Sequence, residues 1–157
     1  MEFGGMKINE TVQVAEMYNE LAYFTQKVTK DDYWDFGTLS SEYMSNSLKD
    51  LVDHPERRIF VARENNQCVG FIAGEISQCH LPLSSIKKIG FIGAAYVAPE
   101  YRGKGVMKAL EALIVDFFRE CGVKYSELFF IANNEVGRKC WNSLGYQTFR
   151  EQARKRI

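Results

Sequence analysis

The feature that most constrains this chain is a strong strand pattern that runs into a glycine-containing turn and then into a long amphipathic helix. Apolar residues dominate from Ile89 to Val97, and Gly103 and Gly105 stand in the turn that follows. From Val106 to Cys121 the apolar residues recur at the three- and four-residue spacing of one helix face. Together with the patterns described below, this unit predicts an α/β (α+β) fold in which the helix packs on a sheet.

The turn between this strand and this helix has the properties of an anion site. Glycine adopts positive φ readily and lets another group approach the backbone closely. The first N–H groups of a helix have no partner inside the helix, and the macrodipole adds partial positive charge there. Arg102, Lys104 and Lys108 surround the same end with formal charge. The stretch therefore predicts a site for a phosphate or pyrophosphate.

Composition narrows the class of partner. At 157 residues, 46% of them hydrophobic, the chain is long enough for one good core and short for two, so we expect a single domain over residues 1–157. Lys and Arg together number 20, as do Asp and Glu, so the net charge is zero and favours neither nucleic acid nor an acidic membrane as partner. No apolar run approaches the roughly 20 residues of a membrane helix, and residues 1–6 lack the basic and apolar regions of a signal peptide, so we expect neither feature.

The cysteines and histidines give no indication of a metal site. The four cysteines show neither a CxxC pair nor metal-ligand spacing, and the two histidines are isolated. We therefore expect no metal, and free, mostly buried thiols in a protein of the reducing cytoplasm.

The remaining chain alternates between helical and strand patterns. We expect a short strand at Met6–Ile8, helices at Asn9–Thr25 and Ser40–Val52, strands at Ile59–Arg63, Cys68–Ile76 and Tyr125–Ala132, a helix from Asn134 to Leu144, and a last strand at Tyr146–Phe149. The continuous apolar run Leu128–Ile131 predicts burial on both faces. In the strand Ile89–Val97, Gly90 and Gly93 predict a bulge or a backbone close to a ligand. The basic run Arg150–Arg156 is expected to be a solvated tail.

The loop between the first two expected helices has an unusual composition. Residues Asp31–Phe36 hold three carboxylates and three aromatic rings in six positions. Such a loop makes a good wall for a cationic ligand, through charge and cation–π contact, with Asp32, Trp34 and Asp35 as candidate contacts. The alternative is a loop whose aromatic side chains close the edge of the core, and the sequence leaves both open.

From Ile89 to Tyr146 the sequence resembles the GCN5-related N-acetyltransferase (GNAT) family. That family opens the helix after a strand with the motif Gln/Arg-x-x-Gly-x-Gly/Ala, and the corresponding stretch here is Arg102-Gly103-Lys104-Gly105-Val106-Met107. Downstream the family carries Asn-x-x-Ala-x-x-x-Tyr and then Gly-Phe, and the corresponding residues here are Asn134, Gly137, Trp141, Gly145 and Tyr146. Two motifs at the right separation are far more specific than either one alone.

The resemblance implies a mixed central sheet, flanked by helices, that splays open beside the strand ending at Val97. Acetyl-CoA would enter that gap, its pantetheine arm pairing with the strand backbone and its pyrophosphate lying on the turn. The residues assigned in this way to cofactor binding are Ala95, Tyr96, Val97, Arg102, Gly103, Lys104, Gly105, Val106, Met107, Lys108 and Asn134. Asn134 is also a good helix cap, and the two roles can coexist.

This sequence departs from the family at the groups that move protons. Trp141 replaces the tyrosine that protonates the leaving thiolate in many members, and an indole N–H is no acid near neutral pH. The positions that hold a general base in many members correspond to Phe91, Gly93 and Phe129, and none of these accepts a proton. The remaining catalytic candidates are Tyr96 beside the cofactor and Glu75 on the central hairpin, with Asp32, Asp35 or a water chain as further routes for the ammonium proton.

Two functions from different classes follow. The first is an acetyl-CoA-dependent N-acetyltransferase in which a primary amine attacks the thioester directly; the acidic–aromatic loop favours a small cationic acceptor, and a peptide N-terminus stays open. The second is a catalytically silent CoA-binding regulatory module, which Trp141 and the apolar base positions favour. A Rossmann nucleotide-binding domain fits poorly because Lys108 stands where its third glycine belongs. Members of the family often dimerise, so a homodimer is among the expected assemblies.

Overall fold

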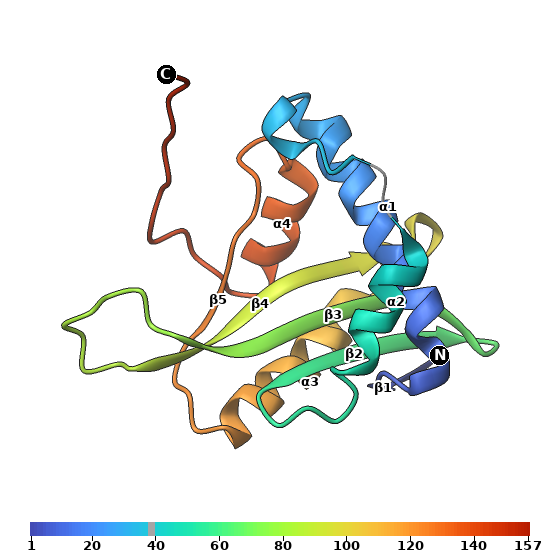
Figure 1. The fold of residues 1–157 in the computed structure, drawn as a ribbon. Helices are drawn as coiled ribbons and strands as arrows, with labels where there is room; N and C mark the ends of the chain where they lie inside the picture. Colours follow the sequence, from blue (N-terminus) through green and yellow to red (C-terminus); the bar gives the residue numbers. More distant parts are fainter. Residues whose placement is uncertain (38–39) are drawn as a thin grey trace.

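The structure is a computed structural model that describes residues 1–37 and 40–157. Its centre is a mixed sheet of strand order β1-β2-β3-β4-β5 (Figure 1). The strands are β1 Glu2–Gly5, β2 Arg57–Glu64, β3 Gln67–Gln78, β4 Lys88–Val97 and β5 Ser126–Leu128. Neighbouring strands are antiparallel except β4 and β5, which are parallel. The expected mixed α/β architecture is confirmed.

Helices cover both faces of this sheet. They are α1 Thr11–Thr29, α2 Ser41–Lys49, α3 Val106–Glu120 and α4 Glu135–Ser143, with short 3-10 turns at Ile8–Glu10, Asp32–Trp34 and Pro99–Tyr101. One core cluster joins α1 and α2 to the sheet, and a second joins α3 and Trp141 of α4 to its other side. No helix in the described part of the chain is long and apolar enough to cross a membrane.

The helix α3 forms as its apolar periodicity predicts and ends where expected. Its inner face is fully buried at Leu110 and Ile114, and Gly122 terminates it with a φ of +76°. Its Phe118 lies so close to β4 that a Cβ at Gly90 would stand 2.3 Å from the ring. Gly90 is therefore small because the helix needs the space, and not because a ligand approaches it.

A bulge at Gly93 changes which side chains of β4 face which layer. The register pairs Ala94 with Ala73 and Ile92 with Gly74, which leaves Gly93 as the extra residue. Ile92 before the bulge and Ala95 after it both face the α3 side, although they are three residues apart. The predicted bulge is confirmed, and it turns the side chain of Tyr96 toward α1.

The sheet opens along the second half of β4. The strand β5 pairs with β4 over Gly90–Ile92 and ends at Leu128, whereas β4 continues to Val97. Among the described residues, no strand therefore lies beside the outer edge of β4 beyond the bulge, as the resemblance implied.

Several expected elements differ from those in the structure. The first strand is Glu2–Gly5, because this short edge pairs through its backbone with β2; Met6 then ends the strand, and a 3-10 turn begins at Ile8. The strand Tyr125–Ala132 shrinks to Ser126–Leu128, and Phe129 is 68% exposed, because beyond Leu128 the chain leaves β4. Tyr146–Phe149 forms no strand; the amide of Tyr146 instead donates to the carbonyl of Trp141 at the end of α4.

All four cysteines are free, as expected. Cys121 is exposed at the end of α3, so the expected burial is wrong there, whereas the other three are half-buried. Burial raises the pKa of the Cys68 thiol to about 11, which keeps it in the unreactive thiol form.

Candidate active site

The turn before α3 presents a row of backbone amides. Gly103 and Gly105 have φ values of +72° and +79°, so each takes the left-handed conformation that glycine favours. Gly105 is the N-cap of α3, and no side chain in residues 1–37 or 40–157 caps this end. Within the described chain the first helical amide with a partner is that of Ala109, which donates to the Gly105 carbonyl at 3.1 Å. The amides before it lie at the positive end of the helix dipole.

Two basic side chains fix this turn. Nε of Arg102 donates to the carbonyl of Val97 at 2.8 Å, and its guanidinium carbon stands 5.8 Å from the ring centre of Tyr96. Nζ of Lys104 lies 5.5 Å from the ring centre of Tyr101. Arg102 therefore ties the turn to the end of β4 and adds positive charge beside the amides. Met107 packs against the α3-side core, so its side chain points away from the row of amides.

The open edge of β4 offers further hydrogen-bonding groups. The amide of Ala98 donates to Val69 on β3. Because backbone groups alternate along an antiparallel strand, Tyr96 also bonds toward β3, whereas Ala95 and Val97 turn their amides and carbonyls to the open side. Because the Val97 carbonyl already accepts from Arg102, an extended ligand beside β4 would pair with the backbone of Ala95 and with the amide of Val97, and Tyr96 would contribute its side chain only.

Asn134 is held rigidly at the start of α4. Its side-chain oxygen accepts a hydrogen bond from the amide of Gly137 at 2.9 Å, which is the expected helix cap. A Cβ at Gly137 would lie 2.6 Å from Nδ2 of Asn134, so the glycine is required for this cap. Trp141, one helical turn after Gly137, is buried in the core, and the centre of its ring lies 5.4 Å from that of Tyr146. It cannot serve as a proton donor at the cofactor.

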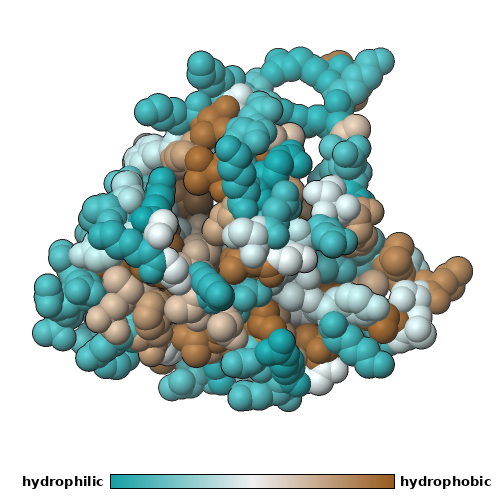
Figure 2. Space-filling model, turned by 180° about the vertical axis from the view of Figure 1, so that it is seen from behind, coloured by the Kyte–Doolittle hydropathy of each residue, from teal (hydrophilic) through white to brown (hydrophobic). Residues whose placement is uncertain are grey.

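These features fit a coenzyme A molecule. An uncapped helix end with flanking arginine and lysine suits a pyrophosphate. An unpaired strand edge suits the amide-containing pantetheine arm, as in recognition by strand addition. From behind, Figure 2 shows a hollow with an apolar lining in the upper part of the molecule, where Figure 1 places α4 and the open end of β4.

The comparison with known proteins decides the family. The chain matches the model of the acetyltransferase (GNAT) family over residues 18–146, which is most of its length. The chain belongs to this family.

Two proteins named as N-acetyltransferases are similar to this chain at low sequence identity. An uncharacterized N-acetyltransferase from Methanocaldococcus jannaschii is 26% identical over 149 residues, which cover 84% of this chain and 64% of that protein. One from Archaeoglobus fulgidus is 26% identical over 109 residues, or 69% of this chain and 73% of that protein. This chain thus spans less than two thirds of the length of the Methanocaldococcus relative.

Solved structures share the GNAT fold. A mutant of the BH1408 protein from Bacillus halodurans matches with a TM-score of 0.85 at 15% identity, over 100% of this chain and 99% of that one. The aminoglycoside N-acetyltransferase AAC(6')-Iy in complex with CoA matches with a TM-score of 0.74 at 15% identity, over 99% of this chain and 98% of that one. At these identities the likeness establishes the fold.

The two catalytic candidates from the sequence have different environments. Tyr96 is half-buried, and this burial, together with the nearby Glu20 carboxylate, raises the pKa of its phenol above the usual value. The phenol therefore stays protonated and is a donor, not a base. Glu75 pairs with Arg57 at 3.2 Å, with 41% of its side chain exposed, and lies on the face of the sheet opposite α3, since its neighbour Gly74 faces that helix.

A row of side chains across the sheet brings in a carboxylate that the sequence analysis did not single out. The register aligns Arg57, Glu75, Phe91 and Glu127 on four successive strands. Since Ile92 and Leu128 face α3, their neighbours Phe91 and Glu127 face the other side, the one that carries Tyr96. Glu127 is one residue from the point where β5 leaves β4, and Nδ1 of His80 stands 3.8 Å from its carboxylate. Only the strand register brings these groups together.

The acidic–aromatic loop folds into a 3-10 turn at the end of α1. The Asp31 carboxylate accepts the amide of Tyr33 at 2.9 Å, and that of Asp35 accepts from Gln26 and Gly37 at 3.1 and 3.0 Å. Trp34 is half-buried and its ring lies 5.9 Å from that of Tyr33, which is 73% exposed. None of the loop's three rings belongs to either core cluster of the described residues, so the core-closing alternative is wrong.

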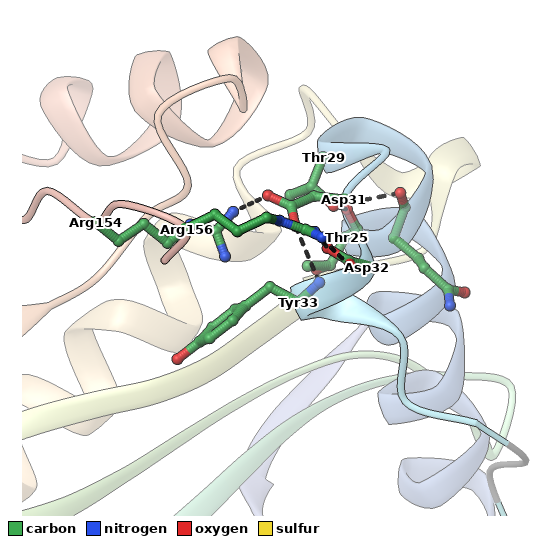
Figure 3. Close-up of polar contacts among 8 residues, drawn as sticks. Thr25, Thr29, Asp31, Asp32, Tyr33, Arg154 and Arg156 are labelled. Carbon is green, nitrogen blue, oxygen red and sulfur yellow. Dashed lines mark hydrogen bonds and ion pairs between the residues drawn. The ribbon is translucent and has the colours of Figure 1, made fainter.

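This loop also contacts the C-terminal segment, contrary to the expectation of a fully solvated tail. Arg154 pairs with Asp31 and Arg156 pairs with Asp32 (Figure 3). The carboxylates of Asp31 and Asp32 are therefore already paired with arginines of the same chain. Glu20 of α1 lies near Tyr96 and so marks the level of that residue along the helix. The loop begins after Thr29, nine residues further on, which is about 14 Å along the axis of α1.

Proposed function

We propose that this GNAT protein is an acetyl-CoA-dependent N-acetyltransferase that acts on a primary amine of a small cationic molecule. The observation that carries the proposal is the junction of the open β4 edge with the uncapped end of α3. Together these two features offer hydrogen-bond donors and positive charge along the path proposed for the pantetheine arm and the doubly anionic pyrophosphate.

The roles of the binding residues follow from their positions. The amides from Gly103 to Lys108 would hold the pyrophosphate, with Arg102 fixing the turn. Ala95 and Val97 would pair with the pantetheine arm, and Nδ2 of Asn134, whose oxygen is engaged in the cap, is free to meet the same arm from α4. Acetyl-CoA supplies a thioester that a neutral amine attacks directly, giving an acetamide and free coenzyme A.

The chain's own residues would manage two protons. The phenol of Tyr96, kept protonated by its surroundings, would donate its Oη proton to the sulfur of the leaving coenzyme. The incoming ammonium group must lose a proton, and we assign its acceptance to the carboxylate row. Within this row Glu127 is better placed than Glu75, because Glu127 lies at the opening of the sheet and its basic neighbour His80 is 3.8 Å away, whereas Glu75 is paired at 3.2 Å with the permanently charged Arg57. General-base assistance of this kind is worth about 10²–10⁴ in rate.

The composition of the loop Asp31–Phe36 supports a cationic acceptor. Asp32, Trp34 and Asp35 combine carboxylates with aromatic surface, a chemistry suited to ammonium groups. The fold match to AAC(6')-Iy, named an aminoglycoside N-acetyltransferase, supports a polycationic amine as the class to test first.

The test is a thiol-release screen with acetyl-CoA against panels of polyamines, aminoglycosides, amino acids and peptides. The binding-deficient variant is Arg102→Glu with Gly105→Asp, which should abolish turnover. Its matched control is Arg119→Glu with Gly122→Asp, the same changes at the other end of α3, where a glycine has nearly the same φ of +76°. Equal activity in the two double variants would remove the basis of the proposal.

A second candidate function is a CoA-binding module without turnover. Trp141 favours it, because this residue is buried in the core and leaves its family position without a proton donor. Tight acetyl-CoA binding with no thiol release across the whole amine panel would select this alternative.

A further inference from the structure

The C-terminal segment returns to the loop that follows α1, more than 120 residues earlier in the chain. Nη2 of Arg156 lies 2.7 and 2.5 Å from the two carboxylate oxygens of Asp32. Arg154 forms an ion pair with Asp31, and its guanidinium carbon stands 4.5 Å from the ring centre of Tyr33. Figure 3 shows both arginines reaching from the tail toward the turn. Two guanidinium groups thus meet two carboxylates and one aromatic face.

The loop side of this contact is shaped by its own backbone. One oxygen of Asp31 accepts the amide of Tyr33 and the other pairs with Arg154, so the carboxylate is oriented before the cation arrives. The same turn exposes the face of the Tyr33 ring beside it. Asp31 is the more enclosed carboxylate, with 27% of its side chain exposed against 70% for Asp32.

The tail side has a matching spacing. Residues 145–157 form no helix or strand, and in an extended chain residues two apart point to the same side. Arg154 and Arg156 therefore present two cations to one surface, while Lys155 between them has no ion pair with a described residue. The loop therefore requires of its partner only two neighbouring positive groups, and many ligands carry such a pair.

We infer that Asp31, Asp32 and Tyr33 form a two-point site for ligands that carry paired guanidinium or ammonium groups, and that the chain's own tail occupies it as a tethered competitor. The competition with an acceptor amine rests on the proposed function; the binding site itself does not. Exposed ion pairs and a single cation–π contact are individually weak, so the tail is displaceable and is weakened further by salt. Its removal should tighten binding of a dication by about three- to tenfold, which corresponds to a tail that fills the site in roughly two thirds to nine tenths of the molecules.

The first experiment measures the site without any acetyl transfer. The full-length variant Arg154→Ala with Arg156→Ala is titrated with a synthetic peptide of residues 151–157, and the fluorescence of Trp34 beside Tyr33 reports binding. We expect saturable binding at least threefold tighter than to the native chain. Adding Asp31→Asn and Asp32→Asn to the double-alanine variant should abolish peptide binding. The matched control in the tail is Lys155→Ala alone, which should bind the peptide as the native chain does. Equal affinity in the native chain and the double-alanine variant, or binding that survives loss of both carboxylates, overturns the inference.

The second experiment concerns competition. With an amine that supports thiol release, the Arg154→Ala and Arg156→Ala variant should show a KM about three- to tenfold lower than the native chain, with unchanged kcat. An unchanged KM for a dicationic acceptor refutes the competition. If no amine supports turnover, the proposed function fails, while the peptide titration still decides whether the site exists.

Discussion

Replacing Gly137 by alanine separates the structural role of Asn134 from its role at the cofactor. The new Cβ would lie 2.6 Å from Nδ2 and 3.0 Å from Cγ of Asn134, so the side chain must leave its present position. Losing an N-cap costs about 1 kcal/mol, and alanine in place of glycine in a helix returns about 1 kcal/mol. The two nearly cancel, so Tm should move by no more than a few degrees. The displaced Asn134 can no longer meet the pantetheine arm, and affinity for coenzyme A should fall about fivefold to tenfold, the value of one hydrogen bond.

The assay is calorimetric titration of coenzyme A, together with thermal unfolding. Asn134→Ala provides the comparison, since it loses the cap with no compensating gain and should be less stable by about 1 kcal/mol with the same loss of affinity. Asn134→Ser keeps a capping oxygen but is too short to reach a ligand, so stability should be retained and affinity lost. Full affinity in the Gly137→Ala and Asn134→Ser variants would refute the idea that Asn134 is positioned for the cofactor.

Three further predictions concern the core and the catalytic row. Gly90→Ala should lower the free energy of unfolding by about 1–3 kcal/mol in urea titrations, because its Cβ would overlap the Phe118 ring at 2.3 Å. Glu127→Gln should lower kcat by about 10²-fold or more with little change in coenzyme A affinity, whereas Glu75→Gln should have a smaller effect; the reverse order would reassign the base. Glu10 of the first 3-10 turn and Arg63 of β2 form a buried ion pair, so Glu10→Gln should cost about 3 kcal/mol because it leaves the Arg63 charge buried without a counter-charge. Although burial alone raises the pKa of the Glu10 carboxyl, the hydrogen bonds from Arg63 and the Lys7 amide hold it below the usual value. The stability from this carboxylate is thus present above pH 4.5 and is lost as pH falls through the lowered pKa, so the variant should show a flatter acid limb of stability against pH.

The strand–turn–helix unit was predictable because its determinants are local. The apolar period of Val106–Cys121, the glycines with positive φ and the bulge at Gly93 all depend on residues close together in the sequence. The cap at Asn134 was predictable for the same reason. These are the parts that bind the cofactor in the proposal.

The features that the sequence did not reveal depend on long-range placement. Glu127 joins Phe91 and Glu75 only through the register of three strands, and His80 approaches it from the loop between β3 and β4. The apolar run after Leu128 suggested a buried strand, but the opening of the sheet removes the partner that would have covered Phe129. The pairing of Arg156 with Asp32 spans 124 positions, and no local pattern announces it.

The most direct test of the central claim compares coenzyme A with pantetheine, which lacks the pyrophosphate together with the 3'-phosphoadenosine, in the native chain and in the two helix-end variants. If the amides at the start of α3 hold the pyrophosphate, the native chain should bind coenzyme A at least about 100-fold more tightly than pantetheine. The Arg102→Glu and Gly105→Asp variant should lose most of this difference, while the Arg119→Glu and Gly122→Asp variant should keep it. Equal affinity of the native chain for the two ligands would contradict the assignment of this turn as the pyrophosphate site.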